Sequence, residues 1–179
     1  LDMMKNHGKV VVQSSKKAFT IIDMPYNTYQ NNKQALTNAK NLLNYTKCQS
    51  VKLEIDKTKI PIVSHLVRNK IPVISHIGIL SQQFTDFSKI KLIGKTAKQK
   101  KEMLDLAFWL EDAGSSLLLL ECINKELAKE ITEKVSIPTI GIGSSIFCDG
   151  KILVINDILN IDDMAKKPKF VKTYINLST

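Results

Sequence analysis

Six short apolar segments alternate along the chain with longer amphipathic or polar ones, and this alternation constrains the fold more than any other feature. The apolar segments predict strands at residues 17–23, 50–55, 71–79, 115–122, 137–143 and 151–157. Apolar residues recur at helical spacing in three intervening segments, which predicts helices over 30–45, 96–112 and 124–136. Strands that are apolar on both faces and separated by helices indicate a parallel sheet covered by helices.

Two arrangements of such a sheet are open at this point. Six strands fit either an open doubly wound sheet or most of an eight-stranded barrel. No Gly-x-Gly-x-x-Gly segment opens a helix, which disfavours a dinucleotide-binding fold. The linkers are short and no internal repeat is present, so we expect one domain over residues 1–179. No apolar run approaches the roughly 18–20 residues of a membrane span, so we expect no membrane partner.

The composition bears on partners and on the cellular compartment. The chain has 26 Lys and Arg against 17 Asp and Glu, a net charge of +9, which raises the possibility of nucleic-acid binding. The lysines are spread along the chain, however, and no aromatic residues alternate with the basic clusters at 95–101 and 165–169. We therefore expect no nucleic-acid partner. Three widely spaced cysteines without a Cys-x-x-Cys pair argue against disulfides and zinc and favour a reduced, cytoplasmic setting.

Polar side chains lie at or near the ends of the predicted strands. They are Asp23, Lys52, Glu54, His76, Glu121 and Asp157. Lys52 and Glu54 are two residues apart, so their side chains share one face of the strand. Ligands of parallel α/β folds bind beyond the carboxyl ends of the strands. We therefore expect these side chains to converge on one site.

Each of these residues also has a structural explanation. Asp23 could cap a turn, and Lys52 with Glu54 could form a structural ion pair. His76 could be a core histidine with satisfied hydrogen bonds. Glu121 is the hardest to explain in this way, because burial at the end of a Leu-rich strand penalises its charge unless a function or partner retains it.

The residue types of this group indicate a kind of chemistry. Two or three carboxylates and one lysine, without a Cys/His cluster, suit a hard cation such as Mg²⁺. They also suit an anionic substrate, whose carboxylate Lys52 would neutralise.

Several stretches together resemble the ketopantoate hydroxymethyltransferase family. The matching stretches run in family order over nearly the whole chain: IIDMPYNTY, SVKLE, IPVISHIGIL, LLLLECINKELAKEITEKVSIPTIGIG, DGKILVIND and KPKFVK. The resemblance implies an incomplete (β/α)₈ TIM barrel with about six of eight parallel strands. It also implies Mg²⁺ as cofactor and a homo-oligomeric assembly.

The resemblance further implies a reaction and roles for individual residues. The reaction transfers a hydroxymethyl group from 5,10-methylenetetrahydrofolate to 3-methyl-2-oxobutanoate, giving 2-dehydropantoate for pantothenate biosynthesis. Asp23 resembles a metal ligand that also meets substrate, and Glu54 resembles a carboxylate of the metal's environment. Lys52 and His76 resemble substrate-binding residues, and Glu121 resembles the catalytic base that removes the C3 proton.

The chain also departs from the family pattern. No counterpart of the family's Gly-Asp-Ser metal-binding motif is present. Ile55 and Asp56 replace two glycines where we expect backbone freedom to be needed, Ser81 replaces a proline, and GIGSS at 141–145 replaces Gly-Ile-Gly-Ala-Gly. These departures support an alternative to the active enzyme, namely an N-terminally truncated, catalytically impaired remnant.

Overall fold

The computed structural model describes residues 1–83, 91–161 and 171–177. The strands are β1 (Ile21–Asp23), β2 (Ser50–Glu54), β3 (Val73–Gly78), β4 (Leu117–Glu121), β5 (Thr139–Ile142) and β6 (Gly150–Lys151). The α-helices are α1 (Asp2–Ser14), α2 (Asn32–Thr46), α3 (Ile60–Arg68), α4 (Ala97–Asp112), α5 (Lys125–Lys134) and α6 (Ile155–Leu159). Two short 3₁₀ helices are η1 (Lys57–Lys59) and η2 (Ser81–Gln83).

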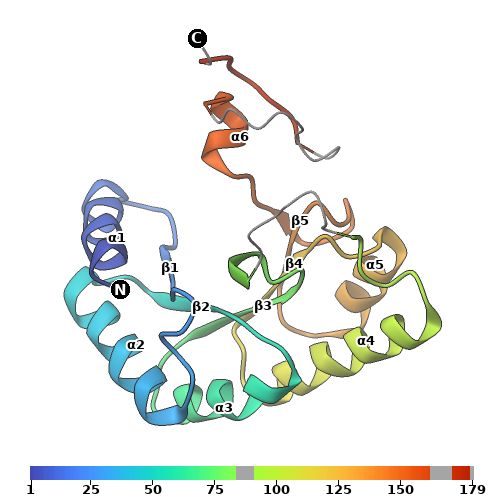
Figure 1. The fold of residues 1–179 in the computed structure, drawn as a ribbon, viewed down its shortest axis with the longest axis horizontal. Coiled ribbons are helices and arrows are strands. Elements are labelled where there is room, and N and C mark those ends of the chain that lie inside the picture. The colour runs from blue at the N-terminus through green and yellow to red at the C-terminus, as the bar shows by residue number, and fades with distance from the viewer. Residues whose placement is uncertain (84–90, 162–170, 178–179) are drawn as a thin grey trace.

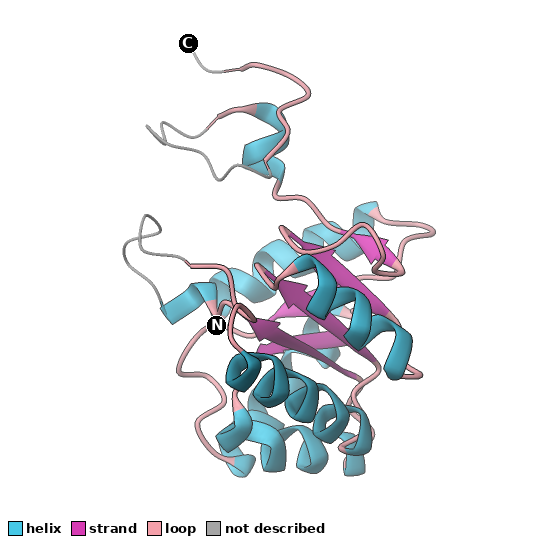
Figure 2. Cartoon of the chain, turned by 90° about the vertical axis from the view of Figure 1, so that its right-hand side faces the viewer, coloured by secondary structure: helices cyan, strands magenta, loops and turns pink. Residues whose placement is uncertain are grey.

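The six strands form one parallel sheet in the order β1-β2-β3-β4-β5-β6. The sheet curls, and the helices that connect its strands lie on its convex side (Figures 1 and 2). Sequential order, parallel pairing and curvature together make a partial (β/α)₈ barrel rather than a doubly wound sheet, whose strand order reverses. The predicted fold class is confirmed.

Local sequence signals define where the helices begin. The side chain of Asn31 accepts a hydrogen bond from the backbone N–H of Gln34 at the start of α2, and Thr96 does the same for Gln99 at the start of α4. Asn124 caps α5 in this way too. Each cap satisfies an N–H group that the helix itself leaves unpaired, which stabilises the helix by about 1 kcal/mol.

Alternate residues of each strand have different environments. One set packs under the helices and forms the hydrophobic core; it includes Ile22, Val51, Leu53, Val73, Ile77, Leu118 and Leu120. The other set faces the concave side of the sheet. On β5 the two sets alternate cleanly between buried and half-buried residues. The period of two residues in a strand therefore separates a packed convex face from a more accessible concave face.

The predicted sixth strand, 151–157, is wrong beyond Lys151. Strand β6 contains only Gly150 and Lys151, and the chain then leaves the sheet and forms α6. Asp157 lies in the first turn of this helix and not at a strand end. The segment pairs with β5 on one side, and the described part of the chain offers no strand on the other side to extend the ladder.

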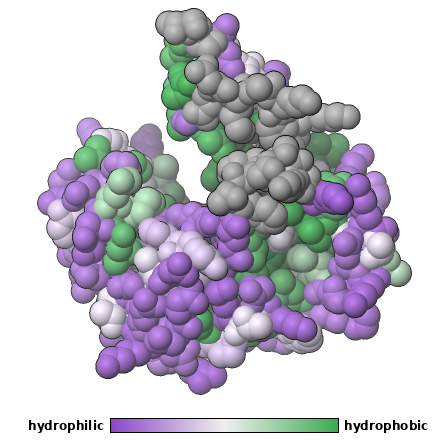
Figure 3. Space-filling model, in the orientation of Figure 1, coloured by the Kyte–Doolittle hydropathy of each residue, from purple (hydrophilic) through white to green (hydrophobic). Residues whose placement is uncertain are grey.

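The residues after β6 leave apolar side chains exposed. Ile152, Leu153, Val154 and Ile155 are each between 42% and 59% exposed. The segment from α6 onward projects from the body of the molecule and carries apolar residues, whereas hydrophilic residues dominate the helix-covered part below it (Figures 1 and 3). The Ile- and Val-rich pattern that suggests a strand is thus present, but it lacks a neighbour.

Two helices, α1 and α3, were not among those predicted from the sequence. Helix α1 packs against α2 and β1 through Gly8, where an added Cβ would lie 2.6 Å from Ile22 Cδ1. None of the helices within the described ranges is long and apolar enough to cross a membrane. The basic cluster at 165–169 lies outside those ranges.

Candidate active site

The register of the sheet brings four predicted site residues into one continuous chain of contacts. Asp23 pairs with Lys52 between β1 and β2, and their side chains form an ion pair with 2.8 Å between Asp23 Oδ2 and Lys52 Nζ. Lys52 Nζ also lies 3.3 Å from His76 Nδ1. His76 Nε2 in turn lies 3.1 Å from Glu121 Oε2. The chain of contacts runs along the carboxyl ends of β1 to β4.

The position of Lys52 fixes the tautomer of His76. A lysine ammonium only donates hydrogen bonds, so His76 Nδ1 must accept and the ring proton lies on Nε2. This N–H faces Glu121, although it is not aligned on the carboxylate as in a full hydrogen bond. His76 is therefore a neutral ring that holds the Glu121 carboxylate by an electrostatic contact.

Glu54 lies beside this chain of contacts and is fully buried. Its Oε1 accepts hydrogen bonds from the backbone N–H of Gln82 at 2.9 Å and from Ser81 Oγ at 3.2 Å. The same oxygen is 3.9 Å from His76 Nδ1. Its Oε2 is buried and has no hydrogen-bond partner within the described parts of the chain.

Asp23 also has one engaged and one unengaged oxygen. Its Oδ2 receives Lys52 Nζ and, at 3.0 Å, Gln82 Nε2. Its Oδ1 is buried without a hydrogen-bond partner among the residues that the structure describes. A cavity of about 210 Å³ lies against this carboxylate, lined by Met4, Asp23, Pro25 and Gln82.

This donor set fits a hard divalent cation. Three carboxylates against one ammonium leave the group with a formal charge of −2, which such a cation would balance. The unengaged oxygens of Asp23 and Glu54 are carboxylate ligands of the kind that Mg²⁺ prefers. No cluster of three or more metal-binding side chains occurs in the described ranges. This agrees with the usual Mg²⁺ site, which combines one or two carboxylates with water and substrate.

Cys122 follows Glu121 at the end of β4 and has an unusual backbone. Its φ is +51°, the left-handed region that non-glycine residues seldom occupy. Burial, followed by the charge of Glu121, raises the pKa of the thiol to about 11. Cys122 is therefore a protonated, packed thiol at neutral pH, as predicted, on the opposite face from Glu121.

Three polar contacts of the site escaped the sequence reasoning. Ser81 and Gln82 belong to η2, which follows β3, and the hydroxyl of Tyr29 accepts a hydrogen bond from the backbone N–H of Glu54 at 3.3 Å. Burial, followed by the neighbouring charges of Glu54 and Asp23, raises the pKa of Tyr29 above its ordinary value. The closeness of Gln82 to the predicted strand end at 79 is the sequence signal that could have identified η2.

The departures from the family pattern are accommodated by the backbone. The expectation that residues 55 and 56 need glycine is wrong, because neither has a positive φ and Asp56 (φ −103°) caps η1. Ser144 Oγ donates to the carbonyl of Leu120 at 2.7 Å and accepts from the backbone N–H of Ile123 at 3.1 Å. The residues that replace glycine therefore contribute hydrogen bonds of their own.

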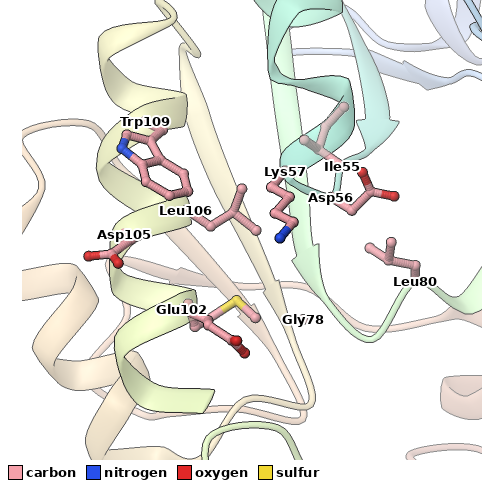
Figure 4. A pocket seen from close by; sticks show the side chains of 10 residues that line it. Ile55, Asp56, Lys57, Gly78, Leu80, Glu102, Asp105, Leu106 and Trp109 are labelled. Atoms are coloured by element: carbon pink, nitrogen blue, oxygen red, sulfur yellow. The ribbon is translucent and has the colours of Figure 1, made fainter. Parts of the chain in front are cut away.

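A larger cavity of about 340 Å³ lies away from these residues. It is formed by α4 and the segments that follow β2 and β3, with Trp109 on one side and Lys57 near its centre (Figure 4). None of the predicted site residues lines it. The structure thus separates the largest cavity of the described chain from the cluster of charged groups.

A curled parallel sheet with acids, a lysine and a histidine at its carboxyl edge is the arrangement found in α/β-barrel enzymes. A sequence model of the family described as ketopantoate hydroxymethyltransferase matches residues 1–179. The chain belongs to this family.

Three relatives support the assignment, each named 3-methyl-2-oxobutanoate hydroxymethyltransferase. The protein of Pelagibacter ubique is 46% identical over 177 residues, which cover 99% of this chain and 67% of the relative. The protein of Helicobacter acinonychis is 42% identical over 98% of this chain and 64% of its own length. The protein of Anaplasma marginale is 40% identical over 99% of this chain and 63% of its own length. The chain thus spans about two thirds of the length of these curated relatives.

Proposed function

We propose that this chain carries the proton-abstraction site of a 3-methyl-2-oxobutanoate hydroxymethyltransferase of pantothenate biosynthesis. The observation that carries the proposal is the unbroken series of contacts from Asp23 through Lys52 and His76 to Glu121. Family membership and the names of the relatives support the choice of reaction.

The side chains have complementary roles in this proposal. Lys52 binds the carboxylate of the 2-oxo acid, because it is the ammonium closest to the cavity beside Asp23. Glu121 removes the proton from C3 of the substrate, and the electron pair left at C3 attacks the one-carbon unit of the folate. His76 holds Glu121 in position through its Nε2–H.

Asp23 and Glu54 would hold Mg²⁺ through their unengaged oxygens. When bound there, Mg²⁺ supplies Lewis-acid polarisation of the substrate's keto group. The side chains of this chain contribute the proton acceptor and the charge that binds the substrate carboxylate.

The proposal extends to co-substrate, assembly and location. The co-substrate is 5,10-methylenetetrahydrofolate, the product is 2-dehydropantoate, and the protein works in the cytoplasm as a homo-oligomer. Formation of 2-dehydropantoate from both substrates, followed by mass spectrometry, tests the complete reaction separately from its first step.

Proton exchange tests the first step directly. The chain is incubated with 3-methyl-2-oxobutanoate in D₂O, and loss of the C3 proton signal is followed by NMR with Mg²⁺ or with a chelator. We expect exchange that depends on Mg²⁺ and that falls by about 10²–10⁴-fold in Glu121→Gln, the usual contribution of a general base.

Glu126→Gln is the matched control, because Glu126 is an exposed carboxylate in the first turn of α5. It should exchange like the unaltered chain. If the unaltered chain exchanges no faster than Glu121→Gln, the alternative of a catalytically impaired remnant is favoured and the proposed activity fails.

A further inference from the structure

Gln82 contacts both carboxylates that the proposed function assigns to the cation. Its backbone N–H donates to Glu54 Oε1 at 2.9 Å. Its side-chain Nε2 donates to Asp23 Oδ2 at 3.0 Å and to the carbonyl of Met24 at 3.3 Å. One residue of η2 therefore links the end of β1 to the end of β2.

The partners of Gln82 fix the orientation of its side-chain amide. Asp23 Oδ2 and the Met24 carbonyl are both acceptors, so the end of the amide that faces them must be the NH₂ group with its two donors. Both hydrogens are used, one on each acceptor. The amide cannot turn over without placing its oxygen against two acceptors.

These hydrogen bonds determine which carboxylate oxygens remain available. Gln82 and Lys52 engage Asp23 Oδ2, and Gln82 with Ser81 engages Glu54 Oε1. The remaining oxygens, Asp23 Oδ1 and Glu54 Oε2, are the buried atoms without hydrogen-bond partners in the described structure. Gln82 also lines the cavity beside Asp23.

We infer that Gln82 is a positioning residue that holds the Asp23 and Glu54 carboxylates so that one oxygen of each is presented to a divalent cation. The inference rests on the proposed function and deepens it. Without the amide, the Asp23 carboxylate keeps Lys52 as partner but loses the contact that fixes its rotation. Holding ligands in place before the ion arrives raises affinity, because less conformational entropy is lost on binding.

The test compares Gln82→Ala with Gln83→Ala in the full chain. Gln83 is the next residue of the same short helix, has the same side chain and is exposed, so it is a matched control. Mg²⁺ affinity is measured by calorimetry, the melting temperature without metal is recorded, and C3 proton exchange is measured over a range of Mg²⁺ concentrations.

We expect Gln82→Ala to bind Mg²⁺ at least about tenfold more weakly, within the 10–100-fold range usual for partners that orient metal ligands. The half-saturating Mg²⁺ concentration for exchange should rise by the same factor, while the rate at saturating Mg²⁺ changes less than about threefold. Gln82→Asn, which keeps the amide but shortens its reach, should behave like Gln82→Ala. Gln83→Ala should match the unaltered chain.

Other outcomes have distinct meanings. If the unaltered chain binds Mg²⁺ and Gln82→Ala binds it equally well, the positioning role is overturned and the proposed function stands. A fall in melting temperature without a change in Mg²⁺ affinity overturns it as well, since the role is then only structural. If the unaltered chain neither binds Mg²⁺ nor exchanges the C3 proton, the proposed function fails and the role of Gln82 fails with it.

Discussion

The convex and concave faces of the same six-stranded sheet differ in what their side chains do. On β4, Leu120 points into the packed core under the helices and is fully buried, whereas the next residue, Glu121, faces the concave side and meets His76. The same division applies on β2, where Leu53 lies in the core and its neighbours Lys52 and Glu54 belong to the charged group. The alternation of a strand thus lets adjacent residues serve folding and chemistry separately.

The largest expected contrast comes from these two neighbours on β4. Leu120→Ala should lower the free energy of unfolding by about 2–5 kcal/mol, because it empties a fully buried position. Glu121→Gln should leave the free energy of unfolding within about 1 kcal/mol or raise it, while C3 proton exchange falls by about 10²–10⁴-fold. Urea unfolding and the exchange assay measure both. Equal losses of stability in the two variants would contradict the division between the faces.

A substitution at Gly78 should damage both functions at once. Gly78 has a φ of +102°, and an added Cβ would lie 2.1 Å from the carbonyl oxygen of Glu121. Gly78→Ala should cost about 2 kcal/mol or more and should also slow exchange, since the backbone that carries Glu121 must shift. Gly150→Ala, whose Cβ would meet nothing nearer than 3.5 Å, is the control for urea unfolding and exchange. A fully stable, active Gly78→Ala would show that the end of β4 adapts freely.

Replacing Lys52 should affect substrate binding more than folding. Lys52→Met removes the ammonium while keeping most of the side-chain volume, so the substrate concentration at half-maximal exchange should rise about 10–100-fold, the usual loss for a hydrogen bond to a charged group. Lys59→Met removes an ion pair to Asp56 that lies outside the charged group and should leave this value unchanged. A similar rise in both variants would point to net charge and not to the position of Lys52.

The smallest expected effect concerns the packed thiol beside Glu121. Burial and the Glu121 charge raise the pKa of Cys122 from 9.0 to about 11, so the folded chain retains a proton there that the unfolded chain loses. Between about pH 9 and 11 the native state therefore binds more protons, and its stability falls as the pH rises. Cys122→Ala should have a shallower decline in urea unfolding over this range. An identical decline in both proteins would show that other groups cause it.

The sequence predicted the features that depend on local periodicity. Strands such as 115–122 and helices such as 96–112 appear close to their expected bounds as β4 and α4, because burial on a parallel sheet imposes a regular apolar pattern. The end of the predicted strand at 151–157 failed for a non-local reason. A strand needs a neighbour to receive its backbone hydrogen bonds, and the apolar pattern does not record whether one is present.

The candidate site shows the same limit. Asp23, Lys52, His76 and Glu121 could be expected to meet, because parallel strands align their carboxyl ends and the register then places the side chains in order. Gln82 could not be found in this way. Its contacts to Glu54 and Asp23 cross 28 and 59 positions of sequence from an irregular segment without periodicity. Only the path of the loop after β3 shows that it reaches both acids.

The ladder between β3 and β4 has a consequence for errors in assembly. It aligns Gly78 with Glu121 and His76 with Leu119. A slip of β4 by one position would turn every side chain of the strand over, sending the acid into oil and a leucine into the water-facing basin. Such a mistake would be too unstable to persist, so any molecule that survives folding has its proton acceptor aimed correctly. Quality control of the chemistry is thereby built into the hydrogen-bond pattern of the scaffold.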